Sequence, residues 1–105
     1  MAEVILTSAN FDAESSEGVM IVDFWAPWCG PCQAMSPVIA ELAAEFADRA
    51  KVGKINIDEE SELAQKFSVM SIPTFKVFKD GSEVASITGG VAKETLSVEI
   101  EKALA

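Results

Sequence analysis

An apolar run from Val19 to Ala26 constrains the fold of this chain more than any other feature, and one acid interrupts it. A run that is apolar at successive positions predicts a strand buried on both faces, as in a sheet with helices on each side. The interruption is Asp23. An ionised carboxylate costs several kcal/mol to bury unless it is paired or neutralised. We therefore expect Asp23 either to be satisfied by a hydrogen bond or to have a chemical function.

The rest of the chain predicts strands that alternate with helices and then a terminal hairpin around Asp80-Gly81-Ser82. Ser8 or Asn10 is expected to cap the first helix. Alternation favours parallel pairing, so the hairpin makes the sheet mixed, with helices on both faces. The strands are expected at residues 3–6, 19–26, 52–57, 74–79 and 83–88. The helices are expected at residues 10–18, at 31–47, from 58 through 67, and from about 92 onward.

Length and charge limit the classes of function. The 105 residues, half of them hydrophobic, predict one domain over residues 1–105 with a core of its own. A formal net charge of -9 opposes nucleic acid as a partner. No apolar stretch approaches the roughly 20 residues of a membrane helix, and the first residues lack the features of a signal peptide. We expect a cytoplasmic monomer without a membrane partner.

Two cysteines, Cys29 and Cys32, are the only ones in the chain, which also lacks histidine. A structural zinc site uses four ligands, usually Cys or His, so one chain is not expected to hold a metal, although a dimer sharing two pairs could supply four sulfurs. A structural disulfide closing so short a loop adds little stability. The remaining interpretation is a pair that cycles between dithiol and disulfide, with no bound cofactor.

The placement of the pair predicts different roles for its members. Cys29 precedes a helix, where free N–H groups and the helix dipole stabilise a thiolate, so it is expected to attack a substrate disulfide. Cys32 lies one turn inside and is expected to be more buried and to resolve the mixed disulfide. Gly30 and Pro31 keep the turn tight. Because no histidine is present, Asp23 is the candidate to accept the proton of Cys32, directly or through one water.

Several separate motifs resemble those of the thioredoxin family, and together they cover essentially the whole chain. They are Ala26 and Trp28 with the Cys29–Cys32 turn, the strand acid Asp23, the helix proline Pro37, the segment Lys54–Asp58, Ile72–Thr74 and Gly90. The resemblance implies an α/β thioredoxin fold, a mixed five-stranded sheet of order 3-1-2-4-5 flanked by four helices. It also implies a cis Pro73. One departure is Gln33, where many relatives carry Lys or Arg.

The resemblance further implies a substrate-binding surface around Cys29, although ordinary loop packing would also explain its apolar members. The backbone of residues 70 to 72 is expected to pair with an extended substrate strand. Lys54 is expected to lie near Asp23 as a partial charge partner, rather than in solvent as most strand lysines do. Besides Gly30 and Pro31, the implied surface contains Trp28, Met70, Ile72, Pro73, Gly90 and Val91.

The function that these features favour is a protein-disulfide reductase, an electron carrier in cellular redox homeostasis. Its expected partners are oxidised client proteins and a separate thioredoxin reductase, because no nucleotide-binding or flavin-binding motif is visible. Two alternatives remain: an oxidant or isomerase of secreted proteins, and a non-catalytic binding module that docks through the surface around Trp28.

Overall fold

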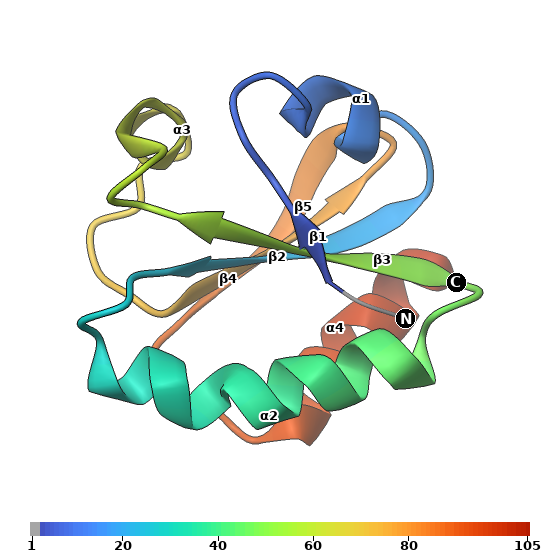
Figure 1. The fold of residues 1–105 in the computed structure, drawn as a ribbon. Helices are drawn as coiled ribbons and strands as arrows, with labels where there is room; N and C mark the ends of the chain where they lie inside the picture. The colour runs from blue at the N-terminus through green and yellow to red at the C-terminus, as the bar shows by residue number, and fades with distance from the viewer. Residues whose placement is uncertain (1–2) are drawn as a thin grey trace.

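The structure, a computed structural model, describes residues 3–105. Helices and strands alternate along the chain before a final hairpin and helix (Figure 1). Within the described residues no helix is both long enough and apolar enough to cross a membrane. The elements are β1 (Val4–Ile5), α1 (Phe11–Ser15), β2 (Val19–Trp25), α2 (Gly30–Glu45), β3 (Ala50–Asn56), α3 (Ser61–Lys66), β4 (Thr74–Lys79), β5 (Ser82–Thr88) and α4 (Lys93–Leu104).

The five strands form one mixed sheet between two layers of helices. Helices α2 and α4 lie on one face, and α1 and α3 lie on the other (Figure 1). Strands β1, β3 and β2 are parallel, whereas β4 pairs antiparallel with both β2 and β5. The expected thioredoxin fold is confirmed in its sheet type and in its flanking helices.

The strand order is β1-β3-β2-β4-β5, and the expected order 3-1-2-4-5 is wrong at one edge. The short β1 is the edge strand, and β3 lies between β1 and β2. Gly53 of β3 shows why this arrangement packs, since a Cβ there would overlap the side chain of Leu6, which follows β1. The doubly buried β2 needs a full-length partner on each side, and the two-residue β1 cannot provide one.

The side chains of β2 alternate between two hydrophobic cores, as a strand with helices on both faces requires. Val19 and Ile21 belong to the core under α2 and α4. Met20, Val22 and Phe24 belong to the core under α1 and α3. This alternation places the next odd position, the acid of the run, on the α2 face of the sheet.

Helix α3 begins at Ser61, three residues later than the sequence indicates. The side chain of Asn56 accepts a hydrogen bond from the N–H of Asp58 at 2.9 Å. The backbone carbonyl of Asn56 accepts hydrogen bonds from the N–H groups of Glu59 and Glu60. This local turn, typical of Asn, uses the N–H groups that would otherwise start the helix. Asp58 is thereby left at the edge of the sheet where β3 ends.

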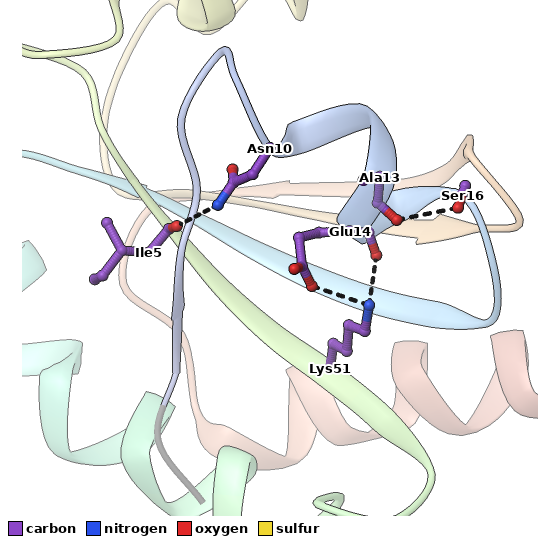
Figure 2. A network of polar contacts seen from close by, with 6 residues as sticks. All are labelled: Ile5, Asn10, Ala13, Glu14, Ser16 and Lys51. Atoms are coloured by element: carbon purple, nitrogen blue, oxygen red, sulfur yellow. Dashed lines mark hydrogen bonds and ion pairs between the residues drawn. The ribbon is translucent and has the colours of Figure 1, made fainter.

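Helix α1 is shorter than expected and has no side-chain cap. The side chain of Asn10 instead donates to the Ile5 carbonyl at 3.0 Å (Figure 2). It also accepts a hydrogen bond from the Thr7 N–H at 2.7 Å. Lys51 of β3 donates to the carbonyl and the carboxylate of Glu14, at 2.9 and 3.0 Å (Figure 2). These contacts tie α1 to the sheet at a distance from the cysteine turn.

The terminal hairpin turns at Asp80 and Gly81 alone, so β5 begins at Ser82. Both turn residues have positive φ, 50° and 88°, which matches the two-residue turns that suit twisted hairpins. The carboxylate of Asp80 accepts a hydrogen bond from the N–H of Gly18 at 2.8 Å, just before β2. The hairpin turn therefore secures the start of β2, and the cysteine turn follows the other end of that strand.

Candidate active site

The cysteine turn joins the end of β2 to the first turn of α2, as the sequence predicts. Cys29 and Cys32 form a disulfide. Cys29 is the residue that caps α2, and its Sγ accepts a hydrogen bond from the N–H of Cys32 at 3.1 Å. A free N–H group at a helix start stabilises negative charge on the atom that it faces. The geometry therefore favours a thiolate on Cys29 once the disulfide is reduced.

The two cysteines differ less in exposure than expected. Cys29 is 5% exposed and Cys32 is 4% exposed, so both are buried. Gly30 and Pro31 between them are the first residues of α2, and both are exposed. The exposed pair forms the outer surface of the turn, and the sulfurs lie beneath it.

Gln33, in the first turn of α2, stabilises the cysteine turn through a side-chain hydrogen bond. Its side-chain amide donates to the carbonyl of Pro27 at 2.7 Å, across the base of the turn. The sequence marks Gln33 only as a missing positive charge. The structure adds that this residue links the helix to the loop before Cys29.

Trp28 stands beside the disulfide with 68% of its surface exposed. Its indole N–H donates to the Asp58 carboxylate, at 3.0 Å to one oxygen and 3.3 Å to the other. Sequence reasoning missed this partner. The signal was available, because β2 and β3 are parallel and the residues that follow their carboxyl ends meet at one edge of the sheet.

A pocket of about 300 Å³ lies against Trp28. Met70 at its rim is 93% exposed, and Ile72 is half-buried and also packs against the cysteine pair. The structure thus brings Trp28, Met70 and Ile72 together. The pocket is lined by Trp28, Ile57, Val69, Met70, Ser71 and Ile72.

The other three residues of the implied surface lie differently. The bond between Ile72 and Pro73 is cis, as the resemblance implies, but Pro73 itself is buried. Gly90 is exposed in the segment between β5 and α4. Val91 is half-buried and packs against the core under α2 and α4. None of these three lines the pocket beside Trp28.

Asp23 is buried in the sheet, with 3% of its surface exposed. Its Oδ1 atom is buried and has no hydrogen-bond partner, so the alternative of a hydrogen-bonded structural acid gains no support at that atom. The pKa of Asp23 is raised to about 7, mainly because the group is buried; the positive charge of Lys54 opposes this rise and the negative charge of Glu3 adds to it. The carboxyl group can therefore take up or release a proton near neutral pH.

Lys54 pairs with Asp23 in the register of β3 and β2, in the position that the resemblance implies. Its ammonium lies 3.7 Å from the Glu3 carboxylate and 4.7 Å from the centre of the Trp25 ring. Sequence reasoning missed both of these neighbours. Alternation along β3 placed Lys54 on a face, but only the pairing of three strands shows that Glu3 reaches the same place.

A second pocket, of about 220 Å³, opens beside Cys32 on this face of the sheet. No group of three or more metal-ligating side chains gathers anywhere in residues 3–105. The pocket is lined by Trp25, Cys32, Gln33, Ser36 and Lys54.

Comparison with known proteins agrees with this geometry. The family model described as Thioredoxin matches residues 2–102. The chain is 50% identical to a thioredoxin of Bacillus subtilis (strain 168) and 47% identical to one of Staphylococcus aureus (strain MW2). Each alignment spans 104 residues, which is 99% of this chain and 100% of the relative. The chain therefore belongs to the thioredoxin family, and it is a thiol–disulfide oxidoreductase that acts by dithiol–disulfide exchange through Cys29 and Cys32.

Proposed function

We propose that this protein reduces disulfides of client proteins in the cytoplasm and that a separate thioredoxin reductase returns it to the dithiol form. One observation carries the proposal: the Cys29–Cys32 disulfide lies at a helix start, directly beside an exposed apolar pocket. The helix start favours the attacking thiolate, and the pocket accepts apolar side chains of a client. Residues 1–105 act as one domain and one monomer in this proposal.

In the first step the thiolate of Cys29 attacks one sulfur of the client disulfide. A mixed disulfide forms between Cys29 and the client, the client S–S bond breaks, and the other client sulfur leaves as a thiolate that takes a proton from solvent. The N–H of Cys32, 3.1 Å from the Cys29 sulfur, supports the charge on Cys29 before attack.

In the second step Cys32 resolves the mixed disulfide. Its thiol gives a proton to the Asp23 carboxylate, directly or through one water, and the resulting thiolate attacks the Cys29 sulfur. The Cys29–Cys32 disulfide forms and the second client sulfur leaves as a thiolate, which is then protonated. The client gains two electrons and the cysteine pair loses two. Asp23 suits this transfer because its pKa of about 7 is close to working pH.

Client binding uses the loop before β4 as well as the pocket. Within residues 3–105 no backbone–backbone hydrogen bond involves Met70 or Ile72. An extended client segment can pair with these free groups as an added strand and place a side chain against Trp28. The carbonyl of Ser71 instead accepts a hydrogen bond from the Thr74 hydroxyl at 2.6 Å, which orders the loop.

Equilibration with glutathione of known potential tests the reductase assignment, together with turnover of a protein disulfide in the presence of a thioredoxin reductase. We expect a reduction potential of about -270 mV, the value typical of the thioredoxin family. A potential of about -120 mV would instead indicate an oxidant. Full biological activity of Cys29→Ser would indicate a binding module.

A further inference from the structure

Three charged side chains from adjacent parts of the sheet lie on its α2 face. Asp23 of β2 pairs in register with Lys54 of β3, and Ile5 of β1 pairs with Lys54 on the other side. Glu3 directly precedes β1, and its carboxylate reaches the Lys54 ammonium at 3.7 Å. The order across the sheet is therefore a buried acid, a lysine and a second acid.

Lys54 lies in the middle of this row, and its ammonium contacts Glu3 and the Trp25 ring rather than Asp23. Its side chain is 15% exposed and that of Glu3 is 21% exposed, so solvent screens their attraction only in part. The Trp25 ring adds a cation–π contact with the ammonium at 4.7 Å. No ion pair within 4.0 Å joins Lys54 to Asp23 in residues 3–105, and Asp23 Oδ1 has no hydrogen-bond partner.

We propose that Glu3 is a positioning residue for the resolving step. Its carboxylate holds the Lys54 ammonium against Trp25, so Lys54 does not fully compensate the negative charge of ionised Asp23. This inference rests on the proposed function for the role of Asp23 as proton acceptor. It gives a role in the reaction to Glu3, a residue that lies outside the cysteine motif. Without Glu3, Lys54 is free to move toward Asp23 and stabilise its ionised form.

The charges that surround Asp23 are few, which makes the effect of Glu3 measurable. The α2 side of the neighbouring pocket contributes Cys32, Gln33 and Ser36, and only the cysteine among them can ionise. The charged groups that act on Asp23 are Lys54 and Glu3, and the charge of Glu3 raises its pKa. Loss of Glu3 therefore lowers the pKa of Asp23 in two ways, through its own field and through release of Lys54.

The first experiment follows the Asp23 carboxyl carbon by NMR against pH in the oxidised protein. We expect Glu3→Gln to move the Asp23 midpoint down by roughly half a pH unit or more. Glu14→Gln is the matched control, because it also removes one negative charge and breaks a Glu–Lys ion pair. Its partner, Lys51 at 3.0 Å, lies on β3 as Lys54 does (Figure 2). An unchanged midpoint in Glu3→Gln, or an equal shift in the control, overturns the proposal.

A second pair of variants separates positioning from the plain field of Glu3. In a Lys54→Met background, Glu3→Gln should move the Asp23 midpoint by less than half as much as it does in the wild type. A shift that keeps its full size without Lys54 shows that Glu3 acts by its own field alone and overturns the positioning role.

Single-turnover kinetics connect the titration to the reaction. At pH 6 the resolution step in Glu3→Gln should run about two- to threefold faster, because more Asp23 is ionised, while the attack by Cys29 is unchanged. An unchanged resolution rate despite a shifted midpoint overturns the kinetic part of the proposal. The Asp23→Asn variant separates the proton role of Asp23 from the positioning role of Glu3. Normal resolution in Asp23→Asn would contradict the proton role, whatever the NMR titration of Glu3→Gln shows.

Discussion

The two sides of the Cys29–Cys32 disulfide have opposite character. The outer side, formed by Trp28, Met70 and Ile72, is exposed and apolar and encloses a pocket of about 300 Å³. The inner side, formed by Asp23 and Lys54, is buried or nearly so and carries charge. One disulfide thus faces solvent and clients on one side and a low-dielectric site on the other.

In the proposed function the two sides have different tasks. A surface that binds many clients has to remain accessible, and each contact contributes a modest share of the binding free energy. On the inner side, burial is the main cause that raises the pKa of Asp23 to about 7. Substitutions on the outer side should therefore change client affinity, and those on the inner side should change stability and pH dependence.

The largest expected effect tests the centre of this comparison, the cysteine pair itself. Cys29→Ser should abolish reduction of protein disulfides, because it removes the attacking thiolate. Cys32→Ser should also abolish turnover but should accumulate mixed disulfides with clients, which non-reducing gels and mass spectrometry detect. Equal trapping by both variants would contradict the division of roles between the two sulfurs.

The next effect concerns the inner side and comes from Asp23→Asn. The folded-state pKa of Asp23 is about 7, above the ordinary 3.8, so the folded state keeps a proton that the unfolded state has lost between these pH values. Wild-type stability from this group is fully present below about pH 4 and is lost as pH rises to 7. Asp23→Asn should gain roughly 4 kcal/mol over wild type across that window and then level off.

Denaturant melts of both proteins from pH 3 to 9 measure this difference. A difference that stays constant across that range would show that Asp23 is not a buried acid of raised pKa. In single-turnover experiments near pH 7, Asp23→Asn should slow resolution by Cys32 at least tenfold, as loss of a general base does, and change the attack by Cys29 less.

A smaller effect is expected on the outer side from Trp28→Ala. It should lower kcat/KM for a protein client about tenfold, with stability changed by less than about 1 kcal/mol, because the side chain is largely exposed. A small organic disulfide that cannot fill the pocket serves as the control substrate. An equal loss with that substrate would place the effect on the chemistry and not on client binding.

The smallest effect returns to the inner side. Lys54→Met removes the positive charge that lowers the pKa of Asp23, so that pKa should rise above about 7. The pH profile of resolution should move to higher pH, and the rate at pH 6.5 should fall about threefold. Lys51→Met on the same strand is the control, because Lys51 pairs with Glu14 at 3.0 Å. Identical pH profiles for both variants would remove Lys54 from the proton step.

Local pattern was enough for most of the fold and for the reacting groups. The apolar run into the cysteine turn predicted a doubly buried strand, and β2 alternates between two cores as expected. The same pattern marked Asp23 as an acid that burial would perturb. These features are legible in the sequence because period, burial and helix position depend on neighbours along the chain.

The local pattern gave the wrong start for helix α3, because a turn at Asn56 competes with the helix there. Asn56 formed a turn that delayed α3 to Ser61, although acids at the preceding positions suggested an earlier start. The side-chain hydrogen bond that Asn56 accepts from the Asp58 N–H outweighs the favourable helix dipole here.

Only the tertiary structure decided which strands are neighbours and which distant charges meet. The edge position of β1 brings Glu3 to Lys54, and the parallel ends of β2 and β3 bring Asp58 to Trp28. The sequence by itself determined the cysteine pair at a helix start, the buried acid and the alternation of strands and helices. It could not determine these contacts, because side chains far apart in the chain meet only through strand order and register, which depend on how the whole sheet packs.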